Sequence, residues 1–279
     1  MASLLALLSS LSWGTSDFLG GLASRRVGAI RVLSVSYPAG AALITVLAWL
    51  VIPGRLTWSL VATAAVVGSV GAVAIGLLYA ALARGQMGII SPITAVLSGA
   101  VPVLVGLAIG EALSTLAFAG VVIAGIAVIL VSREPGPHRR TPVSAVVLAV
   151  ASGLAIGAYL SVLGTAPDDS GIWVAAIGRW FSTVIVVAIL IGMIGRGRGT
   201  SARYPWILAL SAGALDALAN AIFQLAAQRG LLAIVAVIGS LYPAATVILA
   251  RIFLKETLSR IQLTGVVLAL LAASALALA

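Results

Sequence analysis

Residues 91–125 read SPITAVLSGAVPVLVGLAIGEALSTLAFAGVVIAG, and a related stretch, SLYPAATVILARIFLKETLSRIQLTGVVLALLA, occupies residues 240–272. At a constant offset of 145 residues, eight of the seventeen positions that begin at Glu111 are identical to those that begin at Glu256. Aliphatic identities mean little in so apolar a chain, but both copies share a Glu-x-Leu-Ser frame and a glycine at the same distance from the glutamate. The chain is therefore a duplicated protein.

The composition predicts a membrane protein. Of the 279 residues, 62% are hydrophobic and 8% are charged, whereas soluble domains carry about 25% charged residues. The apolar runs are about 20 residues long and continuous rather than alternating, which is typical of helices that cross a bilayer. The net charge of +9 does not indicate nucleic acid, because the basic residues lie between the apolar runs, as orientation signals do. The sequence has no cysteine, which excludes disulfides and thiolate metal sites.

The expected fold is an all-α membrane protein with ten transmembrane helices. The spans are expected near residues 2–23, 29–52, 58–82, 88–109, 113–132, 142–164, 171–195, 204–228, 231–253 and 258–278. The longest connection is SREPGPHRRTP, at residues 132–142, and its proline, glycine and charge mark the joint between the halves. The expected domains are a first five-helix repeat at 1–132, a cytoplasmic linker at 133–141 and a second five-helix repeat at 142–279. Because five is an odd number, the second repeat starts on the opposite side of the membrane, and the two repeats are inverted.

The distribution of basic residues predicts the orientation. The odd-numbered connections between spans hold thirteen lysines and arginines, and the even-numbered connections hold two. Connections rich in lysine and arginine face the cytoplasm. Both termini are therefore expected to be extracytoplasmic, in a multi-pass protein of the plasma or inner cell membrane.

The eighth span carries a polar stripe, because Asp216, Asn220, Gln224 and Gln228 recur at every fourth residue. Polar groups that face lipid are costly, so the stripe is expected to face protein or water. Two interpretations remain: hydrogen bonds that hold the helices together, and the lining of a translocation cavity. Among the corresponding residues of the first half, only Tyr79 has a polar tip.

Arg179 is the one basic residue placed well inside a span. It lies roughly 12 Å from the outer face at about 1.5 Å per residue, at the depth of Asn220 and about 6 Å from that of Asp216. An ion pair between Arg179 and Asp216 is therefore plausible. Arg179 is either a structural partner of Asp216 or a clamp for a substrate carboxylate, and both readings stay open.

The first span carries Asp17 near its cytoplasmic end. Its carboxylate is suited to a proton or a cationic group, or to a pair with Arg25 or Arg26 at the end of the helix. Trp13, one turn earlier, offers a flat apolar wall and one hydrogen-bond donor.

Glu111 and Glu256 open the fifth and tenth spans. A carboxylate there meets unpaired backbone N–H groups and the positive end of the helix dipole, so capping of this turn is preferred to a role in coupling.

Several motifs carry a resemblance to a known family: Trp13-Gly14 followed by Phe18, Gly110-Glu111-x-Leu113-Ser114-x5-Gly120, Lys255-Glu256-x-Leu258-Ser259-x5-Gly265, and Tyr242-Pro243 thirteen residues before Glu256. With its two repeats and ten spans, the whole chain resembles the EamA-like transporters of the drug/metabolite transporter superfamily. The first half departs from the pattern, because Ser98 stands where the second half has Pro243, and Pro102 follows one turn later.

The resemblance implies a secondary transporter, since members of this superfamily move small solutes such as amino acids, drugs and other metabolites, usually outwards. The resemblance does not identify the substrate. Our first hypothesis is a secondary transporter that works by alternating access, with the two repeats rocking about a cavity at the midplane of the membrane. The residues expected to bind substrate are Trp13, Asp17, Tyr79, Arg179, Asp216, Asn220, Gln224 and Tyr242.

Two other functions are weighed against a transporter. A membrane-embedded enzyme is disfavoured, because Asp17, Arg179 and Asp216 are the only ionisable residues well within spans. A passive channel for a small polar solute is the other alternative. The expected partners are the lipid bilayer and a small-molecule substrate, without nucleic acid, metal or cofactor. Coupling to protons and assembly into a homo-oligomer stay open.

Overall fold

The computed structural model describes residues 1–50, 54–82, 84, 87–131, 142–195, 204–254 and 259–278. Within them the chain forms α-helices and one 3-10 helix, η1, at Asp168–Ser170. The helices of the first half are α1 (Ala2–Val27), α2 (Ala29–Leu50), α3 (Trp58–Leu82), α4 (Met87–Ala108) and α5 (Thr115–Val131). Those of the second half are α6 (Val143–Gly164), α7 (Trp173–Ile194), α8 (Trp206–Ala227), α9 (Leu232–Gly239), α10 (Tyr242–Leu254) and α11 (Arg260–Leu278).

The helices lie where the sequence predicts apolar stretches, with one exception. The ninth stretch is broken into α9 and α10 at residues 240–241. Pro243 has no N–H, so the carbonyl of Gly239 lacks its usual helical donor four residues later. The N–H groups of Ser240 and Leu241 close the end of α9 on the carbonyls of Ala236 (2.9 Å) and Ile238 (3.2 Å). The proline therefore accounts for a break that apolarity alone does not indicate.

Among the described helices, five are long and apolar enough to cross a membrane, by length and composition: Ala29–Leu50, Trp58–Leu78, Val143–Gly164, Trp173–Ile194 and Trp206–Ala227. Shorter apolar helices are Ile93–Ala108, Thr115–Val131, Leu232–Thr246 and Arg260–Leu276. Large apolar side chains also lie on the outside of the bundle, where Trp58 is 89% exposed and Ile207 is 80% exposed. An apolar exterior of this kind fits contact with lipid.

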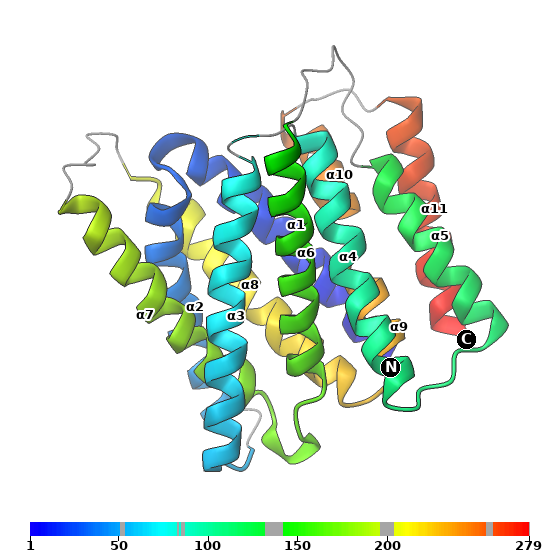
Figure 1. Cartoon of the computed structure of the whole chain (residues 1–279), viewed down its shortest axis with the longest axis horizontal. Coiled ribbons are helices and arrows are strands. Elements are labelled where there is room, and N and C mark those ends of the chain that lie inside the picture. Colours follow the sequence, from blue (N-terminus) through cyan, green and yellow to red (C-terminus); the bar gives the residue numbers. More distant parts are fainter. Residues whose placement is uncertain are drawn as a thin grey trace.

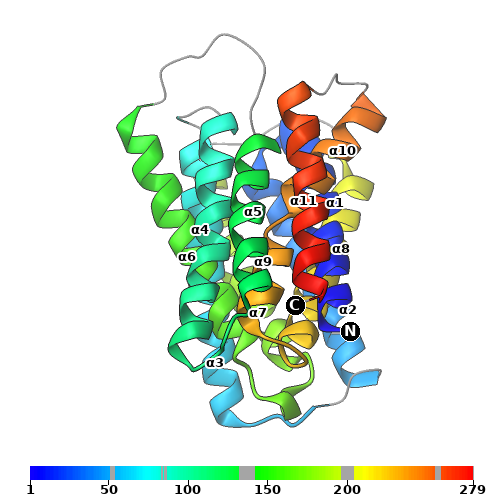
Figure 2. The same cartoon turned by 90° about the vertical axis from the view of Figure 1, so that its right-hand side faces the viewer.

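The two halves of the chain pack into each other. α1 packs on α8, α9 and α10, and α6, the first helix of the second half, packs on α3 and α4. α2 packs on α7 and α8, α7 packs on α2 and α3, and α5 pairs with α11 at one edge of the bundle (Figures 1 and 2). A contact between a helix of the first half and one of the second is therefore matched by a contact between the two equivalent helices of the opposite halves.

Pairs of glycines allow the closest crossings between the halves. A Cβ atom on Gly40 of α2 would lie 2.5 Å from the carbonyl oxygen of Gly213 in α8, and one on Gly68 of α3 would collide with the carbonyl oxygen of Gly178 in α7. Small residues let membrane helices approach in this way. Gly68 and Gly213 are separated by the 145-residue offset of the sequence repeat. The same position of the repeat therefore makes a close crossing in both halves.

The connections lie at two opposite ends of the bundle. Both chain ends lie beside the α4–α5, α6–α7 and α8–α9 connections, and we name this the terminal end (Figure 1). The turn between α1 and α2 lies at the other end, where Gly28 has a φ of 85°, a conformation that glycine adopts readily. We name it the Gly28 end.

Candidate functional site

Helix α1 is held in a fixed rotation by small residues. Ser9 and Ser16 each donate a hydrogen bond from Oγ to a backbone carbonyl of α8, at 2.8 Å in both cases. Gly14 packs against α10 so closely that a Cβ atom there would lie 2.6 Å from a backbone oxygen of that helix. With these faces of α1 in contact with protein, Trp13 and Asp17 line the space between the helices.

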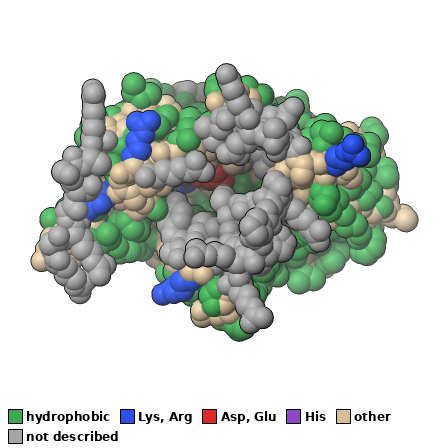
Figure 3. Space-filling view, turned by 90° about the horizontal axis from the view of Figure 1, so that it is seen from above, with side chains coloured by type: hydrophobic (Ala, Val, Ile, Leu, Met, Phe, Trp, Pro, Cys, Tyr) green, Lys and Arg blue, Asp and Glu red, His purple; other side chains and the backbone are tan. Residues whose placement is uncertain are grey.

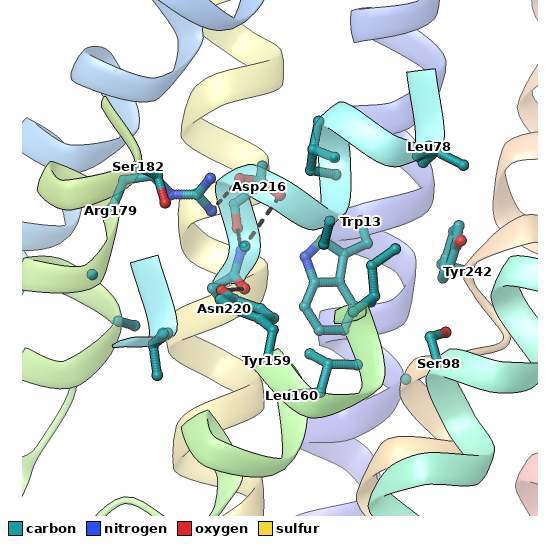
Figure 4. A pocket seen from close by; sticks show the side chains of 18 of the residues that line it. Trp13, Leu78, Ser98, Tyr159, Leu160, Arg179, Ser182, Asp216, Asn220 and Tyr242 are labelled. Carbon is teal, nitrogen blue, oxygen red and sulfur yellow. Dashed lines mark hydrogen bonds and ion pairs between the residues drawn. The ribbon is translucent and has the colours of Figure 1, made fainter. Parts of the chain in front are cut away.

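That space is a cavity of about 140 Å³ between the two halves of the chain. Helices α1 to α4 of the first half and α6 to α10 of the second half all contribute to its wall. Its ionic and aromatic lining includes Trp13, Asp17, Arg179, Asp216 and Tyr242 (Figure 4). Seen from the Gly28 end, the molecule is hollowed at its centre, and an acidic side chain lies in the hollow (Figure 3).

The predicted ion pair between Arg179 of α7 and Asp216 of α8 is present. Arg179 is 9% exposed and Asp216 is 28% exposed, so the pair lies in the wall of the cavity with the carboxylate nearer to its open space. The guanidinium also stacks on the ring of Tyr37, with Cζ 4.6 Å from the ring centroid. Arg179 is therefore held by two partners from α8 and α2.

A chain of hydrogen bonds extends this ion pair. The side-chain amide of Asn220 donates to the backbone carbonyl of Asp216 (2.7 Å) and, over 3.4 Å, to its carboxylate. Asn220 Oδ1 in turn accepts a hydrogen bond of 2.5 Å from the hydroxyl of Tyr159 in α6. Figure 4 shows Arg179, Asp216, Asn220 and Tyr159 in this order along one wall. The wall therefore orients the Asp216 carboxylate from both sides.

Asp17 differs from Asp216, because its carboxylate makes no hydrogen bond or ion pair with any described side chain or backbone group. Arg26 lies on the exterior and does not pair with it, whereas the side chain of Arg25 lies outside the described ones. Asp17 lines the cavity together with Asp216 and Tyr242. The structure thus favours the cavity reading of Asp17 over a pair with Arg26.

The sequence comparisons agree with this architecture. Residues 1–133 and 143–278 both match the sequence pattern of the EamA-like transporter family. The chain belongs to this family. A solved crystal structure, described only as that of a protein, covers 99% of this chain and 96% of its own with a TM-score of 0.80. At 16% identity this likeness shows the fold alone. No curated protein matches the chain.

Membership in the EamA-like family confirms the resemblance inferred from the sequence motifs. Together with the apolar helices, it identifies a multi-pass membrane protein of a transporter family.

The polar stripe of α8 divides into two parts in this EamA-like protein, which corrects the expectation of a continuous cavity lining. Asp216 and Asn220 line the cavity, but Gln224 is fully buried and does not. Its Nε2 donates to Ser170 Oγ (3.1 Å) and the Gly171 carbonyl (2.9 Å), and its Oε1 accepts from a backbone N–H of α7 (3.1 Å). The physical reason is the α6–α7 connection, which folds against this part of α8 and uses the amide.

Gln228 continues the same attachment, since its Nε2 donates to the carbonyls of Pro167 (3.1 Å) and Gly171 (3.0 Å). The side chain of Tyr79, the expected counterpart from the first half, lies outside the described side chains. Of the eight residues expected to bind substrate, the cavity brings together six: Trp13, Asp17, Arg179, Asp216, Asn220 and Tyr242. Their role in binding stays a prediction.

Glu111 caps a helix, but not the one expected. Its two carboxylate oxygens accept from the N–H groups of Leu232 (2.5 Å) and Ala233 (2.9 Å), the first residues of α9. The N-terminus of α5, which follows Glu111 in the sequence, is capped instead by Ser114 Oγ, which accepts from Ala117 N–H (3.0 Å). Glu256 lies outside the described residues, so its capping role stays a prediction.

Sequence reasoning missed Tyr37 and Tyr159, which hold the two ends of the Arg179–Asp216–Asn220 chain. A tyrosine inside an otherwise small and aliphatic span is itself a signal, because a buried hydroxyl usually finds a hydrogen-bond partner.

Proposed function

We propose that this protein is a secondary transporter that moves a small organic solute out of the cell by alternating access. The observation that carries the proposal is the cavity, which lies between the two halves and takes its polar residues from both: Trp13 and Asp17 from the first, and Arg179, Asp216 and Tyr242 from the second. A site at the interface of two repeats can be exposed to either side by a movement of one repeat against the other.

The proposed architecture is ten spans in two inverted repeats. Its support is that equivalent helices of the two halves make equivalent contacts: the first helix of each half packs on the third helix of the other, α1 on α8 and α6 on α3. The recurrence of a close glycine crossing at Gly68 and Gly213 supports it further. Two halves with equivalent contacts can adopt two arrangements of similar free energy, which alternating access requires.

The two ends of the cavity differ in the way expected of a carrier that is open toward one side, a state that an outward transporter needs in order to load its solute. At the terminal end, the α6–α7 connection is attached to α8 by Gln224 and Gln228, and the N–H of Arg55 donates to the carbonyl of Asp169 (2.8 Å). At the Gly28 end, the surface is hollowed (Figure 3). By the distribution of basic residues the Gly28 end faces the cytoplasm of a plasma or inner membrane. In this arrangement a solute would be collected from inside.

Counterflow tests the proposal. The purified protein is reconstituted into liposomes preloaded with one unlabelled amine or amino acid from a panel, and the same compound is added outside at trace level with a radiolabel. A carrier concentrates the label transiently, because the unlabelled solute leaves through the same site. Equilibration without an overshoot for every permeant compound would instead identify a passive channel. Release of chemically altered compounds would identify an enzyme.

A further inference from the structure

The cavity holds one carboxylate more than its ion pair uses. Its described lining residues include two carboxylates, Asp17 and Asp216, and one guanidinium, Arg179. Arg179 is paired with Asp216 and covered by the ring of Tyr37. Asp17 is left without a partner among the described groups, and its side chain is exposed to the open space of the cavity. An unpaired negative charge in such a place favours the uptake of a cation.

The break between α9 and α10 adds hydrogen-bond acceptors to the same wall. Gly239 and Ser240 line the cavity. The Gly239 carbonyl lacks its helical donor, because Pro243, four residues later, has no N–H. The Ser240 carbonyl accepts no hydrogen bond from any described residue. These carbonyls form the C-terminal end of α9, where the helix dipole places partial negative charge. A ligand with N–H donors and a positive charge complements them.

Aromatic rings stand beside these acceptors. Trp13 and Tyr242 both line the cavity, and Figure 4 shows the Trp13 ring between Tyr159 and Tyr242. The ring of Trp13 packs against the ring of Phe223, with the ring centroids 5.5 Å apart. A cation close to the face of a tryptophan or tyrosine gains about 0.5–2 kcal/mol. The ring of Tyr37 already receives Arg179, and the hydroxyl of Tyr159 is bonded to Asn220, so Trp13 and Tyr242 are the lining aromatics without a polar partner among the described side chains.

The size and the remaining lining limit the body of the ligand. The cavity of about 140 Å³ is close to the volume of about 150 Å³ that accepts benzene in an engineered protein. Aliphatic side chains such as Ile75, Leu78 and Ile156 form much of the rest of the wall. A carboxylate is disfavoured as a second group, because Arg179, the one cation among the described lining residues, is already neutralised by Asp216.

We propose that the cavity binds a small organic ammonium ion. Its N–H groups bond the Asp17 carboxylate and the carbonyl of Ser240, its charge lies against Trp13 or Tyr242, and its compact apolar body packs on the aliphatic wall. The proposal deepens the proposed function, and it rests on that function only for the claim that the ammonium ion is carried across the membrane.

Binding is tested with four probes that share one ring and differ in charge. Benzylamine is protonated at neutral pH, benzyl alcohol is neutral, benzoate is an anion and phenylalanine is a zwitterion. Isothermal titration of the purified full chain in detergent should show saturable binding of benzylamine, at least about tenfold tighter than of the other three. Equal or tighter binding of benzoate, phenylalanine or benzyl alcohol overturns the proposal, as does the absence of saturable benzylamine binding.

Substitution of Asp17 tests which carboxylate is responsible. D17N should weaken benzylamine binding by about tenfold or more, since one partner of a charge pair is removed, and should leave benzyl alcohol unaffected. The matched control is D168N, which neutralises an exposed carboxylate of η1 outside the cavity. Benzylamine affinity that survives in a folded D17N variant overturns the assignment to Asp17.

A second measurement keeps Asp17 in place, in case D17N does not fold. Leu78 lines the cavity and is partly exposed, and the chain has no native cysteine, so L78C gives one reactive thiol. Its rate of modification by methyl methanethiosulfonate should fall in the presence of benzylamine and stay unchanged with benzoate. Equal protection by both compounds, or by neither, contradicts a cation site in this cavity.

The experiments distinguish a failure of the proposed transporter from a failure of the proposed ammonium site. Benzylamine binding in detergent, combined with the absence of counterflow in liposomes, would support the ammonium site and reject the transporter. Counterflow of an anionic or neutral solute, without benzylamine binding, would support the transporter and reject the ammonium site.

Discussion

The carboxylate of Glu111, within the α4–α5 connection, accepts a hydrogen bond from the backbone N–H of Leu232 in the other half of the chain. With the second bond, from the N–H of Ala233, the Glu111 carboxylate satisfies two backbone donors that have no partner within α9. Its negative charge also lies at the positive end of the α9 dipole. Helix α9 is short and ends at the cavity, so the position of the Gly239–Ser240 wall depends on this cap.

We expect Glu111→Gln to lower the unfolding free energy by about 1 kcal/mol, because glutamine keeps one acceptor and loses the charge. Thermal unfolding of the purified variant in detergent measures the effect, with D168N as the control. Gly106→Ala should act in the same direction, since its new Cβ atom would collide with the Glu111 carboxylate. Wild-type melting temperatures for both variants would show that the cap does not contribute to stability.

We expect both termini to be extracytoplasmic. Single cysteines are placed at His138, which lies outside the described residues, and at Asp169, in the α6–α7 connection of the terminal end. An impermeant maleimide added to intact cells should label D169C and spare H138C, because connections rich in lysine and arginine stay inside. Labelling only at position 138 would invert the orientation and the direction of transport inferred from it.

The sequence predicts the helices well, because a membrane helix must be a continuous apolar run that satisfies its own backbone. It also predicts the pairing of Arg179 with Asp216, since opposite charges inside a bilayer have few other partners. Trp13 and Asp17 share a face of α1 and both line the cavity, and their role in binding stays a prediction.

What the sequence does not reveal is the identity of the group opposite a polar face. The stripe on α8 is regular, yet Asn220 meets a tyrosine of α6 whereas Gln224 meets the α6–α7 connection. Periodicity reports the direction of a side chain, not the segment that covers it. For the same reason Glu111 indicates a cap, while the helix that it caps depends on tertiary packing across 121 residues.

Gln224 is expected to hold the terminal end closed. Gln224→Leu removes its three hydrogen bonds to the connection and to α7, each worth about 0.5–1.5 kcal/mol. The population open at the terminal end should therefore rise about tenfold or more. In the L78C background, an impermeant thiol reagent added at the terminal end should then react faster. A matched D168N, L78C variant should keep the slow rate, and a slow rate in the Gln224→Leu variant would place the closure elsewhere.

The last prediction concerns Asp216, whose removal leaves Arg179 buried at 9% exposure without its counter-charge. Breaking a buried pair by removing one partner costs about 3–5 kcal/mol, and the lower end applies here because Asp216 is 28% exposed. Asp216→Asn should therefore be strongly destabilised in denaturant unfolding and should not transport.

The double variant with Arg179→Gln removes both charges, so most of the stability should return. Transport should remain absent, because the cavity wall loses both of its paired charged groups. Full counterflow by the double variant would reduce the pair to a scaffold and leave Asp17 and Trp13 as the binding residues. Wild-type counterflow by Asp216→Asn alone would remove Asp216 from the mechanism.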